Sequence, residues 1–379
     1  MLRVTFVASS LPHGGAERLA ITLMTRLAHR GHECHALAIR PATGRLDGIP
    51  PRRLISLDAA TFLDQRALRE FAGHLARLRP HAVVAANPYA LLYAWLALRL
   101  ARVHARLVAT FHSTRLLGAK ERLLMLAYRP LFWSSDALVF VCERQKRYWL
   151  PRGVCSRRNE VIHNGVDTDA FRDRWDAVKR AALRASLGFG AADYVVGVSA
   201  ILRPEKNHVQ MVEAIAELRR RGIPARALFV GDGDTRAAIE ARARDLGVAG
   251  DVVITGLVDD VRPCLAACDV VALCSLSETF SLAALEAMAL GRPVVHSEVG
   301  GAAEMIVPGV NGFLFPAGNT PALVACLAPL ADRTRARAVG ARARRLVEQR
   351  FSETAMVERY EQLLLDLCRE KLEAAAHAT

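Results

Sequence analysis

The feature that most constrains the fold is an alternation of short, β-rich apolar runs with longer stretches of helical periodicity. In the first half of the chain, five runs are predicted as strands: Val4–Ser9, Glu33–Ile39, Ala82–Ala86, Arg106–Phe111 and Ala137–Cys142. Four stretches between them are predicted as helices: Ala16–Arg30, Gln65–Leu78, Pro88–Arg102 and Lys120–Trp133. Repetition of strand, helix and strand predicts a parallel, doubly wound sheet.

A second alternation begins at Tyr194. Its predicted strands are Tyr194–Ser199, Ala227–Val230, Val252–Thr255, Val270–Cys274 and Pro293–Ser297. Its predicted helices are His208–Arg221, Thr235–Leu246 and Leu282–Leu290. The charged stretch Asp167–Asp193 has no clean apolar period and is predicted to be a linker. Because 379 residues exceed what one core supports, we expect two domains, residues 1–175 and 190–352.

Each half therefore predicts a Rossmann-like α/β domain, and we expect the two to face each other across a central cleft. Ligands of such sheets bind outside the carboxyl ends of the strands, which here means inside that cleft. A long amphipathic helix over Met356–Glu373 carries Tyr360, Leu363, Leu364 and Leu367 on one face.

Charge and hydropathy limit the location and the partners. Lys and Arg total 51 against 38 Asp and Glu, and a net charge of +13 attracts nucleotides, nucleic acid or acidic lipid without choosing among them. The longest apolar runs, such as Ala90–Leu98, fall short of the roughly 20 residues that span a bilayer. Arg3 and the polar pair Ser9-Ser10 interrupt the apolar start, so no cleavable signal is expected. We expect a soluble, cytoplasmic protein.

Two loops between a strand and a helix suit phosphate groups. Gly14 and Gly15 precede the first helix, where a phosphate can approach backbone N–H groups and the helix dipole. Arg203 and Lys206 follow the strand Tyr194–Ser199, and two cations at a strand's carboxyl end suit a diphosphate. The alternatives are a tight turn without a ligand for the glycines and a solvated surface for the cations.

A third loop, Gly231-Asp232-Gly233-Asp234, resembles part of a dinucleotide-binding fingerprint. Arg236 stands where its third glycine belongs, which disfavours a nicotinamide oxidoreductase. The D-x-D pairs at 232–234 and 167–169 have no obvious partner ligands, and the cysteines form no CxxC pair. We therefore expect no metal site. The sequence contains no Walker A motif, which excludes a P-loop kinase or ATPase.

The fourth loop leads into the helix Leu282–Leu290 and is the most specific. Glu278 precedes this helix, Ser281 can cap it, and Glu286 lies within it among apolar neighbours. A carboxylate in such surroundings costs several kcal/mol if it is left unpaired. Two carboxylates beside a helix N-terminus suit a ligand with many hydroxyls and one anionic end, which describes a nucleotide sugar.

Five segments together resemble a known family. Glu278 and Glu286 form an E-x7-E motif within a longer matching stretch that ends at Val295, and His163–Asp167 resembles the family's PNGVD segment. Gly14–Arg18, Leu202–Asn207 and Val230–Gly233 also match, in the expected order. From Met1 to about Tyr360 the chain resembles the family 4 retaining glycosyltransferases.

The resemblance implies a GT-B fold, in which we expect the C-terminal helix, residues 353–379, to pack on the N-terminal domain. It also implies an α-linked product of retained configuration without a metal ion or cofactor. Glu278 would contact the transferred sugar, Glu286 the ribose and Lys206 the diphosphate, while His112 would lie near the sugar. The backbone N–H groups of Phe280, Ser281 and Leu282 would meet the sugar or the diphosphate.

Two positions depart from the family pattern. Ile201 stands where many relatives carry the basic partner of the lysine, and Arg203 is the candidate replacement. Ser281 replaces a family glycine, which leaves less room for the sugar and narrows the choice of donor.

The function expected from these features is transfer of a hexose from a UDP-sugar or GDP-sugar to a glycan or lipid-linked acceptor, with no role for nucleic acid. The alternatives are a nucleotide-sugar 2-epimerase on the same fold and an inactive nucleotide-sugar-binding module. The basic and apolar stretch Arg115–Arg129 has helical spacing that suits contact with an anionic membrane, at the inner face of the plasma membrane. An ordinary amphipathic domain helix is the competing interpretation.

Overall fold

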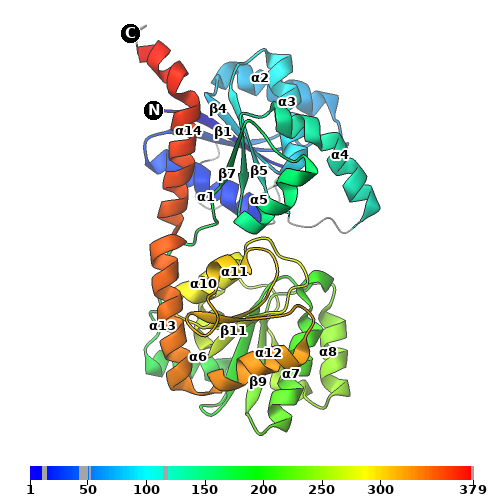
Figure 1. Ribbon diagram of the computed structural model, residues 1–379, viewed down its shortest axis with the longest axis vertical. Helices are drawn as coiled ribbons and strands as arrows, with labels where there is room; N and C mark the ends of the chain where they lie inside the picture. Colours follow the sequence, from blue (N-terminus) through cyan, green and yellow to red (C-terminus); the bar gives the residue numbers. More distant parts are fainter. Residues whose placement is uncertain (11–14, 42–49, 51–52, 114–117, 377–379) are drawn as a thin grey trace. The chain divides into compact units, whose positions relative to one another are not determined.

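The computed structural model describes residues 1–10, 15–41, 50, 53–113 and 118–376, and the chain divides into two compact units (Figure 1). The first unit comprises Met1–Asn164 with Thr354–Thr379, and the second comprises Gly165–Glu353. Each unit is built on one parallel sheet, which confirms the α/β class expected from the alternation. None of the helices in the described ranges is long and apolar enough to cross a membrane.

The sheet of the first unit has seven strands in the order β3-β2-β1-β4-β5-β6-β7. Their bounds are β1 (Arg3–Ala8), β2 (Glu33–Ala38), β3 (Leu54–Ser56), β4 (Ala82–Ala86), β5 (Arg106–Phe111), β6 (Ala137–Phe140) and β7 (Arg158–Val161). All neighbouring pairs are parallel, so the carboxyl ends of the strands lie at one edge of the sheet. The order reverses between β1 and β4, and in sheets of this kind ligands bind outside the carboxyl ends of the strands at such a point.

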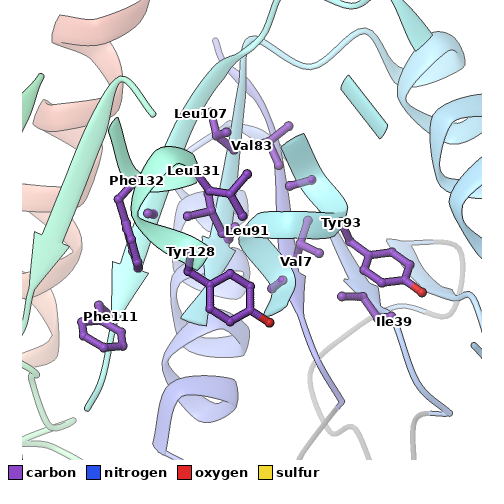
Figure 2. Close-up of a cluster of buried hydrophobic side chains, with 14 of the residues drawn as sticks. Val7, Ile39, Val83, Leu91, Tyr93, Leu107, Phe111, Tyr128, Leu131 and Phe132 are labelled. Atoms are coloured by element: carbon purple, nitrogen blue, oxygen red, sulfur yellow. The ribbon is translucent and has the colours of Figure 1, made fainter. Parts of the chain in front are cut away.

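Helices cover both faces of this sheet. Their bounds are α1 (Gly15–His29), α2 (Gln65–Leu78), α3 (Asn87–Ala101), α4 (Ala119–Ser134), α5 (Glu143–Trp149), the 3₁₀ turn η2 (Leu150–Arg152) and α14 (Glu353–Ala376). On one face, side chains of α2, α3 and α4 fill a core that includes Phe71, Tyr93 and Phe132, part of which Figure 2 shows.

The C-terminal helix α14 completes the opposite face of the first unit. Tyr360, Leu363 and Leu364 are buried in one cluster with residues of β1 and α1. A polar contact fixes the register, because Nε2 of His32 lies 2.6 Å from Oε1 of Glu361. The backbone N–H of Leu2 donates to Nδ1 of the same histidine at 3.0 Å.

The second unit has six parallel strands in the order β10-β9-β8-β11-β12-β13, which is the doubly wound order 3-2-1-4-5-6. Their bounds are β8 (Tyr194–Ser199), β9 (Ala225–Val230), β10 (Val252–Ile254), β11 (Val270–Leu273), β12 (Val294–Ser297) and β13 (Gly312–Phe315). The helices are α6 (Ala177–Ser186), α7 (His208–Arg220), α8 (Arg236–Asp245), α9 (Arg262–Ala267), α10 (Leu282–Ala289), α11 (Ala302–Met305), α12 (Thr320–Leu327) and α13 (Arg333–Arg350). Three 3₁₀ turns complete the unit: η3 (Pro204–Lys206), η4 (Ala249–Asp251) and η5 (Ala328–Ala331).

The stretch Asp167–Asp193, expected to be a linker, belongs to the second unit and contains α6. The buried guanidinium of Arg184 anchors this helix, because it donates to the carbonyl of Ala267 and to the carboxylate of Asp269, each at 3.0 Å. The charge of Arg184, which obscured the helical pattern, is therefore a structural contact of the second unit.

Candidate active site

The topology of the second unit brings two loops together at the point where its strand order reverses. One loop follows β8 and carries Arg203 and Lys206, and the other follows β11 and carries Glu278. Nζ of Lys206 lies 2.5 Å from Oε2 of Glu278, although 72 residues separate them in sequence. Their side chains are only 24% and 20% exposed, which strengthens the attraction relative to a pair in open water. The structure thus joins two residues that the sequence predicted as parts of separate motifs.

The backbone of the Glu278 loop is fixed at several points. The N–H of Leu276 donates to the carbonyl of Glu205 at 2.8 Å, which ties this loop directly to the turn that carries Lys206. The hydroxyl of Ser297 donates to the carbonyl of Ser275 at 2.6 Å. The N–H of Gly301 donates to the carbonyl of Thr279 at 2.7 Å, so the carboxylate of Glu278 is held on a loop with little freedom.

Helix α10 begins directly after this loop. The hydroxyl of Ser281 caps the helix by accepting from the backbone N–H of Ala284 at 3.3 Å, as the sequence predicted. The ring of Phe280 is buried and packs on Phe351 with 5.5 Å between the centroids, so only its backbone is available to a ligand. Leu282, half-buried, is the first helical residue. The first turn of a helix presents backbone N–H groups and a positive dipole end, which favours an anionic ligand.

The other predicted residues of the second unit lie around this centre. Glu286 is buried within α10, one turn beyond the cap. Arg203 is exposed at the start of η3, and Ile201, the departure from the family pattern, is also exposed.

Gly231 supports the Lys206 loop from the end of β9. Its φ is 148°, and a Cβ placed there would lie 2.1 Å from the carbonyl oxygen of Ala200. The next residue, Asp232, also contacts the Lys206 loop, because its carbonyl accepts from the N–H of Leu202 at 3.0 Å. Gly231 is thus required for close packing of the two loops.

The two D-x-D pairs have structural partners. The carboxylate of Asp232 pairs with Arg236 at 3.0 Å, and Asp167 accepts from the backbone N–H groups of Asp169 and Ala170. Within the described ranges, no group of three or more His, Cys, Asp or Glu residues is arranged to hold a metal ion.

Sequence reasoning missed two buried histidines of the second unit. His296, on β12, is fully buried, and its Nδ1 lies 2.6 Å from the carbonyl of Ser297. Burial lowers the pKa of His296. The nearby charge of Glu278 raises this pKa, and that of Lys206 lowers it. Burial, aided by Lys206, lowers the pKa of His208 to about 4, so this first residue of α7 is neutral at pH 7. No local motif marks His296, which lies between Val295 and Ser297 in a short strand.

His112 lies in the first unit, directly after β5. Its backbone N–H donates to Oδ1 of Asn87 at 3.2 Å, and its Nε2 lies 3.2 Å from the hydroxyl of Thr110. Burial lowers the pKa of His112 to about 4, so the ring is uncharged at neutral pH.

The backbone around His112 is held by two further side chains that the sequence did not indicate. The amide of Gln145 donates to the carbonyls of Phe111 and Ser113, and the indole N–H of Trp149 donates to Ser113 at 2.7 Å. Gly15 is the first residue of α1, at the crevice predicted by the strand order. Gly14 lies outside the described residues.

Comparison with known proteins identifies the family. The model described as Glycosyltransferase Family 4 matches residues 13–170, and that described as Glycosyl transferases group 1 matches residues 192–333. The lipopolysaccharide core biosynthesis glycosyltransferase LpsE of Rhizobium meliloti is 30% identical over 359 residues, which are 93% of this chain and 96% of LpsE.

Two further proteins are similar to this chain. The GDP-mannose-dependent alpha-(1-6)-phosphatidylinositol monomannoside mannosyltransferase of Mycolicibacterium smegmatis is 33% identical over 246 residues, 62% of this chain and 63% of that protein. The crystal structure of Anabaena HepE in complex with UDP-glucose superposes with a TM-score of 0.84 at 22% identity, over 97% of this chain and 100% of HepE. The fold is therefore the GT-B fold expected from the resemblance. The chain belongs to the family 4 glycosyltransferases.

Proposed function

We propose that this glycosyltransferase moves a hexose from a nucleoside-diphosphate sugar to a hydroxyl of a glycan or lipid-linked acceptor, with retention of the α configuration and without a metal ion. The observation that carries the proposal is the ion pair between Lys206 and Glu278 beside the start of α10. It combines a cation and a helix N-terminus, which suit a diphosphate, with a carboxylate that suits sugar hydroxyls. Crystal structures of the similar protein HepE in complex with UDP and with UDP-glucose support a nucleotide-sugar donor.

Each residue has a distinct role in the proposed donor complex. Lys206 and the exposed Arg203 bind the diphosphate together with the backbone at Phe280, Ser281 and Leu282. Glu286 accepts from the ribose hydroxyls, and Glu278 accepts from hydroxyls of the transferred sugar. Gly14, Gly15 and Gly231 bind the donor through their backbone, which no Cβ shields. Gly231 also packs the Lys206 loop against the end of β9.

The proposed chemistry proceeds on one face of the sugar. The bond between the anomeric carbon and the diphosphate oxygen breaks, and the acceptor oxygen forms its bond to that carbon from the same side. The acceptor's proton passes to the departing phosphate oxygen, so no protein base is needed. Lys206, Arg203 and the α10 dipole stabilise the charge that develops on the diphosphate, which is electrostatic preorganisation.

His112 assists this route as an uncharged group. With a pKa of about 4, its ring does not repel the oxocarbenium-like sugar at neutral pH and is a poor proton donor. The proposed assistance is therefore a hydrogen bond from the ring or an interaction with the backbone carbonyl. Asn87, Gln145 and Trp149 act as positioning residues, because they hold the backbone of residues 111–113.

The proposed acceptor is a glycan or a lipid-linked glycan. LpsE is named for lipopolysaccharide core biosynthesis, and the mycobacterial relative is named for transfer to a phosphatidylinositol monomannoside. A lipid-linked acceptor resides at a membrane, so we also propose a peripheral contact with an anionic bilayer on the cytoplasmic side.

Replacing Lys206 by alanine is expected to weaken binding of UDP or GDP about 10- to 100-fold, because a charge-assisted hydrogen bond contributes roughly 1.5–3 kcal/mol. Calorimetric titration measures the affinity, and melting curves report the fold. For the unaltered protein, UDP or GDP should raise the melting temperature and NAD should not. Arg203→Ala, three residues earlier, tests separately whether that arginine compensates for Ile201. Unchanged nucleotide affinity in Lys206→Ala would remove this lysine from the site.

A further inference from the structure

Helix α4 has an unusual outward face. Met125, Tyr128, Leu131 and Phe132 are buried, and Figure 2 shows the last three among core residues of the first unit. The opposite side of the helix carries Leu123, Leu126, Ala127, Pro130 and Trp133, which we call the α4 face. Leu123 is 70% exposed, Leu126 47% and Trp133 53%.

An apolar outward face is exceptional for a surface helix. A surface helix normally turns polar side chains to solvent. Contiguous exposed apolar patches mark interaction sites. The C-terminal end of α4 is held in place by a hydrogen bond, in which the indole N–H of Trp133 donates to the carbonyl of Gly153 at 2.9 Å.

The net positive charge of the chain belongs to the unit that carries this face. By sequence, the first unit holds 28 Lys and Arg against 15 Asp and Glu, whereas the second holds 23 of each. Residues 99–158, which include α4, contain 13 of these basic residues and only 3 acidic ones. The entire net charge of +13 therefore belongs to the first unit.

Some of these cations lie next to the α4 face. Arg152 is exposed on η2, which directly precedes the Gly153 that accepts from Trp133, and the half-buried Arg129 of α4 lies beside the same glycine. The guanidinium of Arg152 lies over the ring of Tyr148, with 3.9 Å to its centroid. Exposed leucines and a tryptophan thus adjoin fixed positive charge.

We propose that the α4 face is the surface by which this protein docks on an anionic lipid bilayer, with the leucines entering the headgroup boundary and the neighbouring arginines meeting acidic headgroups. The inference deepens the membrane contact proposed above by naming the surface that makes it. Charge complementarity favours this occupant over a second copy of the chain, since two such faces would bring like charges together. Nucleic acid fits this surface less well, because its charged phosphate backbone provides no apolar surface on which the exposed leucines can be buried.

Vesicle sedimentation of the full chain tests the proposal. We expect binding to vesicles that contain phosphatidylglycerol, at least about tenfold weaker binding to phosphatidylcholine alone, and weakening with added salt. The double variant Leu123→Asp/Leu126→Asp should bind the anionic vesicles roughly 10- to 100-fold more weakly. Leu257→Asp is the matched control, because Leu257 is 79% exposed in the electrically neutral second unit and should bind as the unaltered protein does.

Two further measurements separate the other outcomes. The double variant should keep the rise in melting temperature with UDP or GDP, which shows that it is folded, and Leu123→Ser/Leu126→Ser repeats the test with a milder change. A failed nucleotide response in every protein would contradict the proposed function and leave the docking result standing. Equal binding by the double variant and Leu257→Asp would contradict the proposal that the α4 face docks on the bilayer. Negligible binding of the unaltered protein to both kinds of vesicle would contradict it as well. Loss of a dimer in sedimentation velocity, without loss of vesicle binding, would assign the face to a second copy instead.

Discussion

Replacing Glu278 by glutamine is expected to lower turnover on the order of 100-fold, the scale seen when a preorganised electrostatic contact is removed. The change keeps the size of the side chain but removes the charge that holds Lys206 at 2.5 Å and that would accept from the sugar. Affinity for UDP or GDP should change little, since Lys206 and the start of α10 remain. Steady-state kinetics with titration of the nucleotide separates the two effects.

Glu286→Gln, within the helix that follows the Glu278 loop, is the matched comparison. It should mainly raise KM for the donor because its proposed contact is with the ribose. An equal loss of nucleotide affinity in both variants would contradict the division of roles between the two glutamates. A glycosyl adduct on either glutamate, found by intact mass after incubation with donor alone, would replace the same-face route by a double displacement.

Replacing Gly231 by alanine is expected to cost about 3 kcal/mol or more of stability, the range of severe overpacking. The added Cβ would lie 2.1 Å from the carbonyl oxygen of Ala200, at a φ of 148° that L residues rarely adopt. The resulting shift of residues 200–202 should also weaken nucleotide binding, because Arg203 and Lys206 follow on the same loop. Urea unfolding and nucleotide titration measure the two effects.

Gly247→Ala isolates the contribution of the clash. Gly247 also has a positive φ, 67°, but a Cβ there would meet nothing within 4 Å. Backbone strain alone should cost about 1–2 kcal/mol at this position. If the two variants lost equal stability, the close approach to Ala200 would not explain the glycine at 231.

The sequence predicted the central strands of both sheets well, because buried parallel strands are continuous apolar runs. The strands it missed, β3, β7 and β13, all lie at sheet edges. The edge strand β7 consists of the residues Arg158–Val161, only the last of which is buried. Helix α13 was also missed, since its arginine-rich sequence gives little apolar periodicity.

The sequence predicted which loops form the candidate site but not how their side chains are arranged. Parallel topology places the loops after β8 and β11 side by side, but a sequence cannot state which side chains meet there, and the pairing of Lys206 with Glu278 needed the structure. Gly231 and Asp232 were predicted as part of a nucleotide-binding segment, and nothing in the sequence indicated that Gly231 packs on Ala200 or that Asp232 pairs with Arg236. Such contacts depend on tertiary neighbours, which local patterns do not encode.

The anomeric configuration of the glycoside formed is the most direct test of the proposed reaction. UDP-glucose and GDP-mannose, whose sugars are both α-linked, serve as probe donors with whichever acceptor hydroxyl supports turnover, in buffer that contains EDTA. A glycoside cannot change its anomeric configuration in water as a free sugar does, so the one-bond ¹³C–¹H coupling at its anomeric carbon, which differs between the anomers of both glucosides and mannosides, reports the stereochemistry of transfer. We predict an α-glycoside formed in the presence of the chelator, whereas a β-glycoside from the same donor, or turnover abolished by EDTA and restored by a divalent metal, would contradict the proposed mechanism.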